Sequence, residues 1–472
     1  MFEAARMADP PRPSSFEPRS WQRERRPFFR SLIVGLGKTG LSCARYLRGQ
    51  GVAVAVTDSR RAPPALEEAR REMPDLALFL GGFDAGVFAA AERLIVSPGV
   101  SLREPAIAAA AAQGVPVLGD IELFARAAGA PVAAITGSNG KSTVTTLLGE
   151  MTRLAGVRAA VGGNLGQPAL DLLDDSVELY VLELSSFQLE STSSLKTWVA
   201  AVLNVTADHM DRYQSLAEYA AAKARILPGA QTAVLNRDDA VAWAMAGIAK
   251  RDIGFRLGAP EEESEFGLVE HDGEHWLSRG GKLLLPARSV AAKGRHNLAN
   301  ALAALAMGQA CGLPEVAMLE ALRTFRGLPH RIAFVAAKGG VDWYDDSKGT
   351  NPGATLAALR GLIDPKSPAR AVLIAGGDCK GADFRPLAPV VERAARAVVL
   401  IGRDAPMIER VLRDRAKLLH AKDIKDAVRV AYHAAQPGDC VLLSPACASF
   451  DMFVSYAHRG RAFAAAVKEL EL

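Results

Sequence analysis

Short runs of apolar, β-branched residues alternate along the chain with stretches whose apolar residues recur at helical spacing. The clearest example is residues 131–148, PVAAITGSNGKSTVTTLL. Residues 132–135 suit a buried strand, residues 136–140 form a turn rich in glycine, serine and asparagine, and a helical run begins at Lys141. Strands that alternate with helices in this way predict an α/β fold with mostly parallel sheets.

The loop between this strand and helix predicts a phosphate site. A helix N-terminus reached through a glycine turn presents unpaired backbone N–H groups and the positive end of the helix dipole. Lys141 would add a cation for the outer phosphates. The longer G-x-x-x-x-G-K-[ST] motif needs glycine at the position of Ile135, so this loop is a shorter form. An ordinary turn before a helix could have the same composition, but the flanking elements favour phosphate binding. The predicted cradle comprises Gly137, Ser138, Asn139, Gly140, Lys141, Ser142 and Thr143.

Residues 31–119 contain a second glycine loop. An apolar strand leads into GLGKTG at residues 35–40, and the next strand ends at Asp58. This spacing is typical of a dinucleotide-binding fold, in which glycines admit a pyrophosphate and the acid meets a ribose hydroxyl. It makes an NAD-dependent enzyme an alternative hypothesis, but any nucleoside diphosphate can use this geometry. A later strand ends at Ser97-Pro98-Gly99, again at a ligand-binding edge.

The strand at residues 178–184 places an acid in the central part of the chain near the phosphate loop. An acid such as Glu183, at the carboxyl end of that strand, can anchor a nucleotide-bound magnesium ion. A salt-bridged strand end is the simpler alternative. Ser185 and Gln188 follow, and their side chains could form neutral hydrogen bonds with a substrate.

Three further segments of the central part carry candidate groups. His209 lies in a polar loop after an apolar strand, and we predict that it contacts a metal or a substrate. Lys223 lies on an alanine-rich helix, which by itself indicates a solvated lysine. Asn297 and Asn300 share one helix face and could contact an adenine edge, although Asn297 could instead cap the helix. Residues 250–290 are polar and rich in β-formers, which predicts a small antiparallel flap.

A new α/β series follows a linker at residues 327–331. We predict its strands at residues 341–344, 371–375, 397–401 and 440–443. Polar residues follow each strand, so the pattern predicts a second doubly wound unit whose loops converge on one edge. Lys380 in one of these loops could bind a carboxylate, or it could be an ordinary surface lysine. Only the presence of Thr350 and Ser449 in neighbouring loops favours carboxylate binding.

The composition is that of a globular chain. It has 472 residues, 49% of them hydrophobic and 23% charged, which suggests about three domains. Residues 1–30 carry seven arginines and four acidic residues, and therefore most of the net charge of +4. The remaining chain gives no sign of a nucleic-acid surface. No apolar run approaches ~18 residues, so we expect no membrane span.

Residues 1–30 lack a secretory apolar core. They are rich in proline, arginine and serine, so we predict that they are disordered, and translation could begin at Met7. The five cysteines contain no C-x-x-C pair. They predict reduced, buried thiols in a cytoplasmic protein.

In their order along the chain, these motifs resemble those of the Mur ligases of peptidoglycan synthesis. The resemblance runs from about Leu32 to Arg461 and is carried by GLGKTGLSC, SPG, TGSNGKSTVT, GGNLG, LELSSFQL, NVTADHMDRY, EYAAAK, RHNLANALAA, GLPHR, DDSKGTNPGAT, GGDCKGADF and SPACASFD. It implies a Rossmann-like UDP-binding domain at residues 31–119, a central P-loop-type ATPase domain with a mostly parallel sheet at residues 120–326, and a Rossmann-like amino-acid-binding domain at residues 327–472.

The resemblance also implies an activity. An ATP-dependent amide ligase would join D-glutamate to UDP-N-acetylmuramoyl-L-alanine through an acyl phosphate, using ATP and two magnesium ions. The motifs SPACASFD and DDSKGTNPGAT favour D-glutamate over the amino acids that other Mur ligases and folylpolyglutamate synthases add. An oxidoreductase would need neither the γ-phosphate site at Lys141 nor a magnesium anchor at Glu183. A non-catalytic nucleotide-binding protein would need no separate carboxylate pocket. We expect a monomer.

The resemblance assigns roles to residues of this sequence. UDP would contact Gly37, Lys38, Thr39, Asp58, Ser59, Ser97 and Gly99, and the muramoyl-alanine end would face Asn164, Ser185 and Gln188. ATP would contact the phosphate loop, Asn297, Asn300, Arg331, Asp346 and Lys348. D-glutamate would contact Thr350, Lys380, Ser449 and Phe450. Ser142, Glu183, His209 and a carbamylated Lys223 would hold metal, and Lys141, His209 and Lys223 would be catalytic. We expect the third domain to swing in and close the site.

Overall fold

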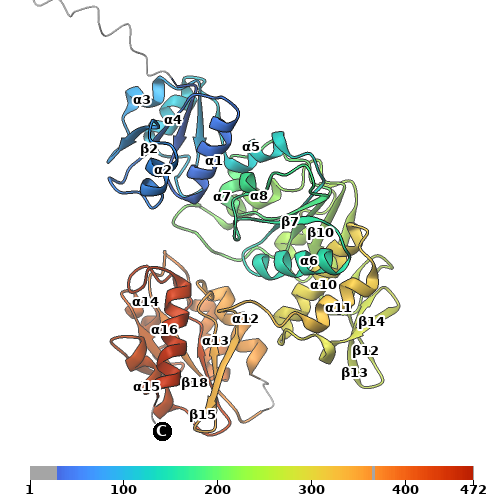
Figure 1. Cartoon of the computed structure of the whole chain (residues 1–472). Helices are drawn as coiled ribbons and strands as arrows, with labels where there is room; N and C mark the ends of the chain where they lie inside the picture. Colours follow the sequence, from blue (N-terminus) through green and yellow to red (C-terminus); the bar gives the residue numbers. More distant parts are fainter. Residues whose placement is uncertain (1–28, 364–366, 471–472) are drawn as a thin grey trace, which may run out of the picture.

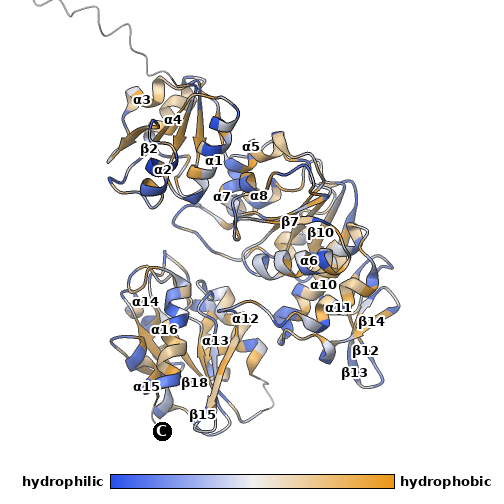
Figure 2. Ribbon diagram, in the orientation of Figure 1, coloured by the Kyte–Doolittle hydropathy of each residue, from blue (hydrophilic) through white to orange (hydrophobic). Residues whose placement is uncertain are grey.

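The computed structural model describes residues 29–363 and 367–470, so almost all of the predicted disordered extension lies outside the described residues. The strands form sheets of five, nine and six strands, one in each of three consecutive bodies (Figure 1). Apolar residues concentrate on the strands and on the helix faces that cover them (Figure 2). Within the described ranges, no helix is both long and apolar enough to cross a membrane.

The N-terminal module is an all-parallel sheet with strand order β3-β2-β1-β4-β5. Its elements are β1 Ser31–Val34, α1 Lys38–Gly49, β2 Val54–Asp58, α2 Leu66–Glu72, β3 Ala77–Leu80, α3 Ala85–Ala89, β4 Arg93–Val96, α4 Pro105–Ala112 and β5 Val117–Leu118. The order reverses at β1, so the loops after β1 and β4 lie side by side, where open α/β sheets bind ligands. The sequence did not predict β3 and β5.

The central module is built on the order β14-β13-β12-β11-β10-β9-β6-β8-β7. Its elements are α5 Asp120–Ala127, β6 Val132–Thr136, α6 Lys141–Leu154, β7 Ala159–Gly163, η2 Ala169–Leu172, β8 Leu179–Glu183, α7 Ser186–Glu190, β9 Val199–Val202, α8 Leu216–Ala224, β10 Thr232–Asn236, α9 Ala240–Trp243, β11 Asp252–Phe255, β12 Phe266–His271, β13 Glu274–Arg279, β14 Lys282–Pro286, η3 Ala287–Ser289, α10 Arg295–Ala310 and α11 Glu315–Thr324. Helix α10 is apolar over most of its surface because it packs on the sheet, α6, α11 and α12.

The predicted flap needs a correction. Strand β11 is parallel to β10, and only β12, β13 and β14 pair in antiparallel fashion. Because β12 pairs with β11 at Phe255 and Phe266, the hairpins extend the edge of the central sheet and do not form a separate unit.

The third module has strand order β15-β16-β20-β17-β18-β19. Its elements are β15 Ala333–Lys338, β16 Val341–Asp345, α12 Pro352–Leu362, β17 Ala371–Gly376, η4 Arg385–Leu387, α13 Ala388–Ala394, β18 Ala395–Ile401, α14 Ala405–Leu412, β19 Lys417–His420, α15 Ile424–Ala434, β20 Cys440–Leu443 and α16 Tyr456–Glu469. The sequence predicted four of these strands and missed β15 and β19, of which β15 is antiparallel to β16. The predicted α/β class is confirmed, whereas the expected domain boundaries stay predictions.

The central module contacts both of its neighbours. Ser42 on α1 donates a hydrogen bond to Asp171 in η2 at 2.6 Å between the oxygen atoms. On the other side, Arg331 of the third module donates to Ser142 at the start of α6 at 2.8 Å. Loops at the carboxyl ends of the central strands therefore meet loops of the third module.

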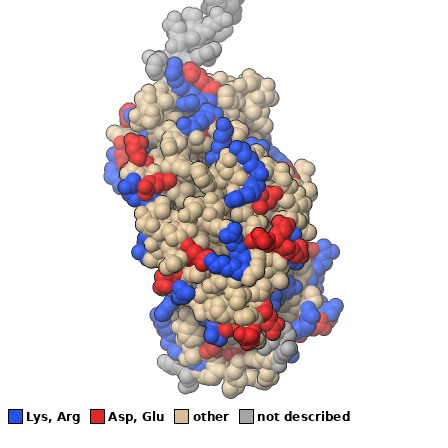
Figure 3. Space-filling view, turned by 90° about the vertical axis from the view of Figure 1, so that its right-hand side faces the viewer, with Lys and Arg blue, Asp and Glu red and all other residues tan. Residues whose placement is uncertain are grey.

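The surface and the cysteines agree with a globular α/β protein. On the face drawn in Figure 3, basic and acidic side chains are intermixed and form no extended basic surface. Cys43, Cys379, Cys440 and Cys447 are buried and Cys311 is half-buried, and all five thiols are free.

Candidate active site

The phosphate loop lies at the junction of β6 and α6. Ile135 is fully buried in β6, paired with β8 and β9, which explains why the glycine turn begins only at Gly137. Gly140 caps α6 with a φ of 85°, a left-handed conformation that suits glycine, and no side chain caps this end. Among the described residues, therefore, no side chain occupies the first N–H groups of α6, and they can bind an anion; the phosphate site itself stays a prediction.

A reciprocal amide pair holds the loop in shape. The backbone N–H of Asn139 donates to Asn204 Oδ1 at 2.8 Å, and Asn204 Nδ2 donates back to the carbonyl of Asn139 at 3.0 Å. Ser138 also exchanges hydrogen bonds with the backbone of Thr206. The segment that follows β9 therefore fixes the shape of the phosphate loop through these hydrogen bonds.

Two lysine side chains share one carbonyl group. Lys141 Nζ and Lys223 Nζ donate to the carbonyl oxygen of Gly137 at 2.8 and 2.9 Å. The indication that Lys223 is solvated was wrong: only 1% of this residue is exposed, and its ammonium lies 4.2 Å from the ring centroid of Tyr219. Burial, reinforced by the charge of Lys141, holds the pKa of Lys223 well below its ordinary value.

Glu183 ends β8 and faces the same cavity. Its Oε1 accepts a hydrogen bond from Asn164 Nδ2 at 2.6 Å, whereas its buried Oε2 has no hydrogen-bond partner among the described residues. A buried carboxylate oxygen without a partner fits a cation ligand. Within the described part of the chain, no three His, Cys, Asp or Glu residues cluster as a metal site. Magnesium commonly uses one or two protein groups together with substrate phosphates, so this donor set fits magnesium.

His209 occupies a tight turn in the loop after β9. Its φ is 57°, its backbone N–H donates to Asp208 Oδ1 at 2.9 Å, and its ring lies 4.8 Å from that of Phe187. Burial is the main reason that its pKa lies below the ordinary value. The ring is therefore neutral near pH 7 and offers a nitrogen lone pair to the cavity.

A cavity of about 250 Å³ lies between the phosphate loop, α10 and the third module. Asn297 and Asn300 both line it. Asn297 does not cap α10, because the cap position is Gly294; its Nδ2 donates to the carbonyl of Lys293 at 2.8 Å. The predicted nucleotide residues that line this cavity are Asn139, Gly140, Thr143, Asn297, Asn300, Arg331, Asp346 and Lys348.

The charged groups of this cavity are strongly desolvated. Burial raises the pKa of Asp346 to about 7, although Ser444 donates a hydrogen bond to its Oδ2 at 2.6 Å. Burial lowers the pKa of Lys348 to about 8, and it also lowers the pKa of Arg331. A polyanion with a ribose would compensate these groups better than water does.

A second cavity, of about 280 Å³, lies on the other side of the phosphate loop. Of the residues predicted for metal, acceptor and amino-acid binding, Ser142, Asn164, Glu183, Ser185, His209, Lys223, Thr350, Lys380, Ser449 and Phe450 line it, together with Lys141. Gln188 does not line it, because it is 2% exposed. Its side-chain oxygen accepts a hydrogen bond from the backbone N–H of Ser185 in a capping box at the start of α7, and its Nε2 donates to Asp120 at 2.9 Å. Its predicted substrate contact stays a prediction.

The glycine loop of the N-terminal module is built for close approach. A Cβ at Gly40 would lie 1.9 Å from the carbonyl oxygen of Gly35, whereas one at Gly37 would meet nothing within 4 Å. Asp58 Oδ2 accepts a hydrogen bond from the backbone of Leu36 at 2.8 Å. Burial opposes the ionisation of Asp58, but hydrogen bonds from Arg60 and Leu36 lower its pKa overall. Ser97 donates to the carbonyl of Gly35 at 2.8 Å.

Family models match all three modules. The MurD-like N-terminal domain of Mur ligases matches residues 30–119, the Mur ligase middle domain matches residues 135–308, and the Mur ligase glutamate ligase domain matches residues 330–447. The chain belongs to the Mur ligase family.

Relatives of this Mur ligase match most of its length. The UDP-N-acetylmuramoylalanine--D-glutamate ligase of Nitrosococcus oceani is 55% identical over 441 residues, covering 93% of this chain and 96% of the relative. The enzyme of the same name from Pseudomonas aeruginosa is 53% identical over 442 residues, covering 93% and 98%.

Among solved structures, UDP-N-acetylmuramate-alanine ligase MurC of Thermotoga maritima aligns with a TM-score of 0.58 at 18% identity, covering 93% of this chain and 99% of that one. MurF of Acinetobacter baumannii aligns with a TM-score of 0.56 at 17% identity, covering 93% and 90%. These structures have the same fold.

Sequence reasoning missed several residues that line the cavities of this Mur ligase. Asp208, Tyr219 and Asn351 line the second cavity, and His296 lines the first. A partial signal existed for Tyr219, which lies four residues before Lys223 and therefore on the same helix face.

Proposed function

We propose that this Mur ligase joins D-glutamate to UDP-N-acetylmuramoyl-L-alanine and converts ATP to ADP and phosphate. The observation that carries the proposal is the second cavity, where Lys141 and Ser142 of the phosphate loop face Lys380 and Ser449 of the third module. Relatives at 52–55% identity that bear the name of this ligase support the choice of substrates.

The three modules divide the substrates between them in this proposal. UDP lies against the first turn of α1, where Lys38 and Thr39 offer backbone N–H groups, and Asp58 and Ser59 lie beside it. ATP occupies the first cavity, with its adenine near Asn300 and its ribose near Asp346. D-glutamate meets Thr350, Lys380, Ser449 and Phe450 at the far wall of the second cavity, where one cation can pair with a side-chain carboxylate.

Magnesium fits Ser142, Glu183 and His209, on the observation that Glu183 Oε2 is buried without a partner in the described residues. When bound, magnesium neutralises charge on the phosphates and the alanyl carboxylate. Lys141 and Arg331 supply further positive charge beside them. We therefore infer that these groups lower the repulsion between the approaching anions.

Lys223 acts as a carbamate in this proposal. Its depressed pKa leaves part of the amine neutral, and a neutral amine adds to carbon dioxide with loss of a proton. The product carries a carboxylate in place of a cation. That exchange removes the conflict between two ammonium groups on the carbonyl of Gly137 and adds an oxygen ligand beside Glu183.

The reaction follows from what a carboxylate lacks. Its oxygen is a poor leaving group, so the alanyl carboxylate first attacks the γ-phosphorus of ATP, ADP leaves, and an acyl phosphate forms. The amine of D-glutamate then attacks the acyl carbon, and the tetrahedral intermediate loses phosphate to give the amide. Holding three substrates in one closed site supplies much of the rate.

Phosphate release tests the proposal directly. The protein is incubated with ATP, magnesium, UDP-N-acetylmuramoyl-L-alanine and either D- or L-glutamate. We expect release with D-glutamate, none without the muramoyl substrate, and loss of release in Lys141→Ala. Absence of release with both isomers would refute the ligase, and release with L-glutamate alone would refute the assigned amino acid.

A further inference from the structure

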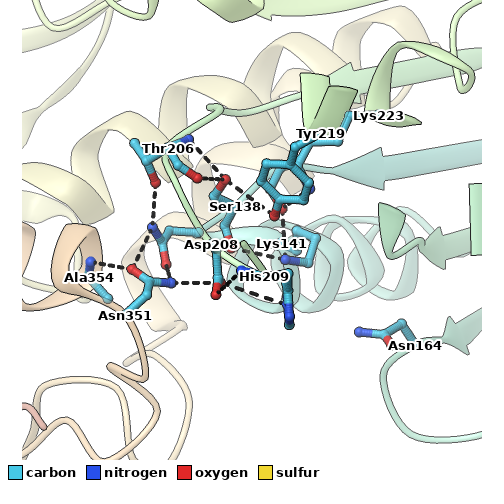
Figure 4. Close-up of polar contacts among 12 residues, drawn as sticks. Ser138, Lys141, Asn164, Thr206, Asp208, His209, Tyr219, Lys223, Asn351 and Ala354 are labelled. Atoms are coloured by element: carbon cyan, nitrogen blue, oxygen red, sulfur yellow. Dashed lines mark hydrogen bonds and ion pairs between the residues drawn. The ribbon is translucent and has the colours of Figure 1, made fainter. Parts of the chain in front are cut away.

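The side-chain amide of Asn351 bridges the third and central modules (Figure 4). Its Oδ1 accepts a hydrogen bond from the backbone N–H of Ala354 at 2.8 Å and so caps helix α12. Its Nδ2 donates to Asp208 Oδ2 at 3.0 Å and to Asn139 Oδ1 at 3.2 Å. One buried amide, 5% exposed, therefore ties a helix of the third module to two loops of the central module.

Few other side chains could make both contacts. Aspartate would cap α12 equally well, but it has no donor for Asp208 and would add a second negative charge there. Serine would cap the helix through its hydroxyl, but it is shorter and has only one polar atom. Asn351 therefore combines an ordinary helix cap with a bond between modules.

The neighbouring Gly353 leaves room for this approach. A Cβ at Gly353 would lie 3.1 Å from Thr206 Oγ1, 3.4 Å from Asn351 Oδ1 and 3.5 Å from Asn139 Nδ2. The first turn of α12 thus lies directly against the loops that follow β6 and β9. This steric fit is an observation independent of the hydrogen bonds.

The two loops that Asn351 contacts carry reacting groups of the proposed function. Asn139 belongs to the phosphate loop, two residues before Lys141. Asp208 accepts the backbone N–H of His209 through its other oxygen, at 2.9 Å, and His209 has a φ of 57°. Thr350, next to Asn351, lines the second cavity. The bridge therefore links the nucleotide, the His209 turn and the amino-acid wall.

We infer that Asn351 is a positioning residue for the ligation. It aligns the third module with the phosphate loop and with the Asp208–His209 turn, so that the amine meets the acyl phosphate in one geometry. The inference rests on the proposed function, because it is for this reaction that the alignment matters.

Replacement by serine separates the cap from the bridge. Asn351→Ser keeps a helix cap and removes the contact with Asp208. Loss of a hydrogen bond to a charged group predicts a fall in kcat/KM for the amino acid of roughly 10- to 100-fold. The matched control is Asp423→Ser: Asp423 caps α15 in the same module through the N–H of Asp426 at 2.8 Å and lies outside both cavities. We expect this control to retain wild-type kinetics.

A reciprocal exchange tests the bond itself. Asn351→Asp alone sets two carboxylates against each other and should lower kcat/KM at least as far as serine does. In Asn351→Asp combined with Asp208→Asn, the new amide at 208 can donate to the new carboxylate at 351, so the hydrogen bond returns with its direction reversed. If the two sites were independent, the effects of Asn351→Asp and Asp208→Asn on kcat/KM would multiply. We expect kcat/KM of the double variant to be about tenfold or more above that product.

Deuterium exchange supplies a readout that does not depend on turnover. Faster exchange of residues 206–212 is expected in Asn351→Asp, with partial return in the double variant. The inference would be overturned if kcat/KM of the serine and aspartate variants stayed within threefold of wild type. It would also be overturned if kcat/KM of the double variant equalled the value expected from multiplying the two single effects. A wild-type protein without D-glutamate-dependent phosphate release would instead refute the proposed function, and the exchange data would still test the bridge.

Discussion

The buried carboxyl group of Asp346 makes the stability of the third module depend on pH. Burial raises its pKa to about 7 from an ordinary value of 3.8. Below the lower value both folded and unfolded states hold the proton. Between the two values only the folded state keeps it, so stability falls as pH rises, and the loss is complete above pH 7. About three pKa units at ~1.36 kcal/mol each correspond to a cost of about 4 kcal/mol.

Asp346→Asn removes this cost without changing the shape of the side chain. An amide at 346 could donate to Ser444 Oγ, whose hydroxyl could then turn to Thr355 Oγ1, 3.1 Å away. We expect the variant to gain about 2–4 kcal/mol over wild type at pH 8 and to gain nothing near pH 4. The lost attraction to Arg331 accounts for the lower end of this range.

Local hydrogen exchange is the suitable assay, because a three-module chain need not unfold in one step. The reporter is the pairing of β16 with β20, which includes the bond from the N–H of Asp346 to the carbonyl of Leu443 at 2.8 Å. Protection of these amides is compared between wild type and variant at pH 5 and pH 8, after correction for intrinsic exchange. A difference in stability that is the same at both pH values would refute the reasoning.

Three further predictions concern the cavities and their support. Lys223→Ala should lose at least ~100-fold in kcat and recover part of it with added short-chain carboxylic acids, as measured by phosphate release; wild-type turnover would contradict the carbamate role. Gly140→Ala would place a side chain on a residue with a φ of 85°, and its Cβ would lie 2.5 Å from Asn300 Oδ1. Calorimetry should therefore detect at least ~10-fold weaker ATP binding, and an unchanged affinity would be inconsistent with this geometry. Arg459→Lys removes the fork through which the buried guanidinium donates to Ser347 and to the carbonyl of Cys447. We expect the β16 and β20 amides to lose about 2–4 kcal/mol of protection in hydrogen exchange, and protection equal to that of wild type would count against this role.

The features that could be predicted from the sequence are those encoded in one continuous stretch of the chain. The phosphate loop is one continuous stretch, and β6, the turn and the start of α6 at Lys141 all follow from it. Glu183 was found in the same way, because a buried strand brings its terminal residue to a known edge of the sheet. The expected adenine face on α10 depended only on the spacing of two asparagines.

Features that depend on packing between distant segments were out of reach. Lys223 looks like a surface lysine on an alanine-rich helix until Tyr219 and Gly137 enclose it. Asn351 looks like a helix cap until the third module meets Asp208, 143 residues earlier in the chain. Strand β15 has an apolar run, Ala333 to Ala337, but its burial depends on antiparallel pairing with β16 at the edge of the sheet, where no residue of β15 is fully buried.

The two cavities adjoin at the phosphate loop. Asn139, Gly140, Arg331 and Lys348 line both of them. In the proposed reaction the phosphoryl group is transferred beside these shared residues, so ADP can stay in the first cavity while the amine attacks in the second. A linked inhibitor with one arm in each cavity would contact these shared residues and both modules. Such a compound would derive its selectivity over other ATP-binding proteins from its arm in the second cavity, because that arm does not resemble a nucleotide.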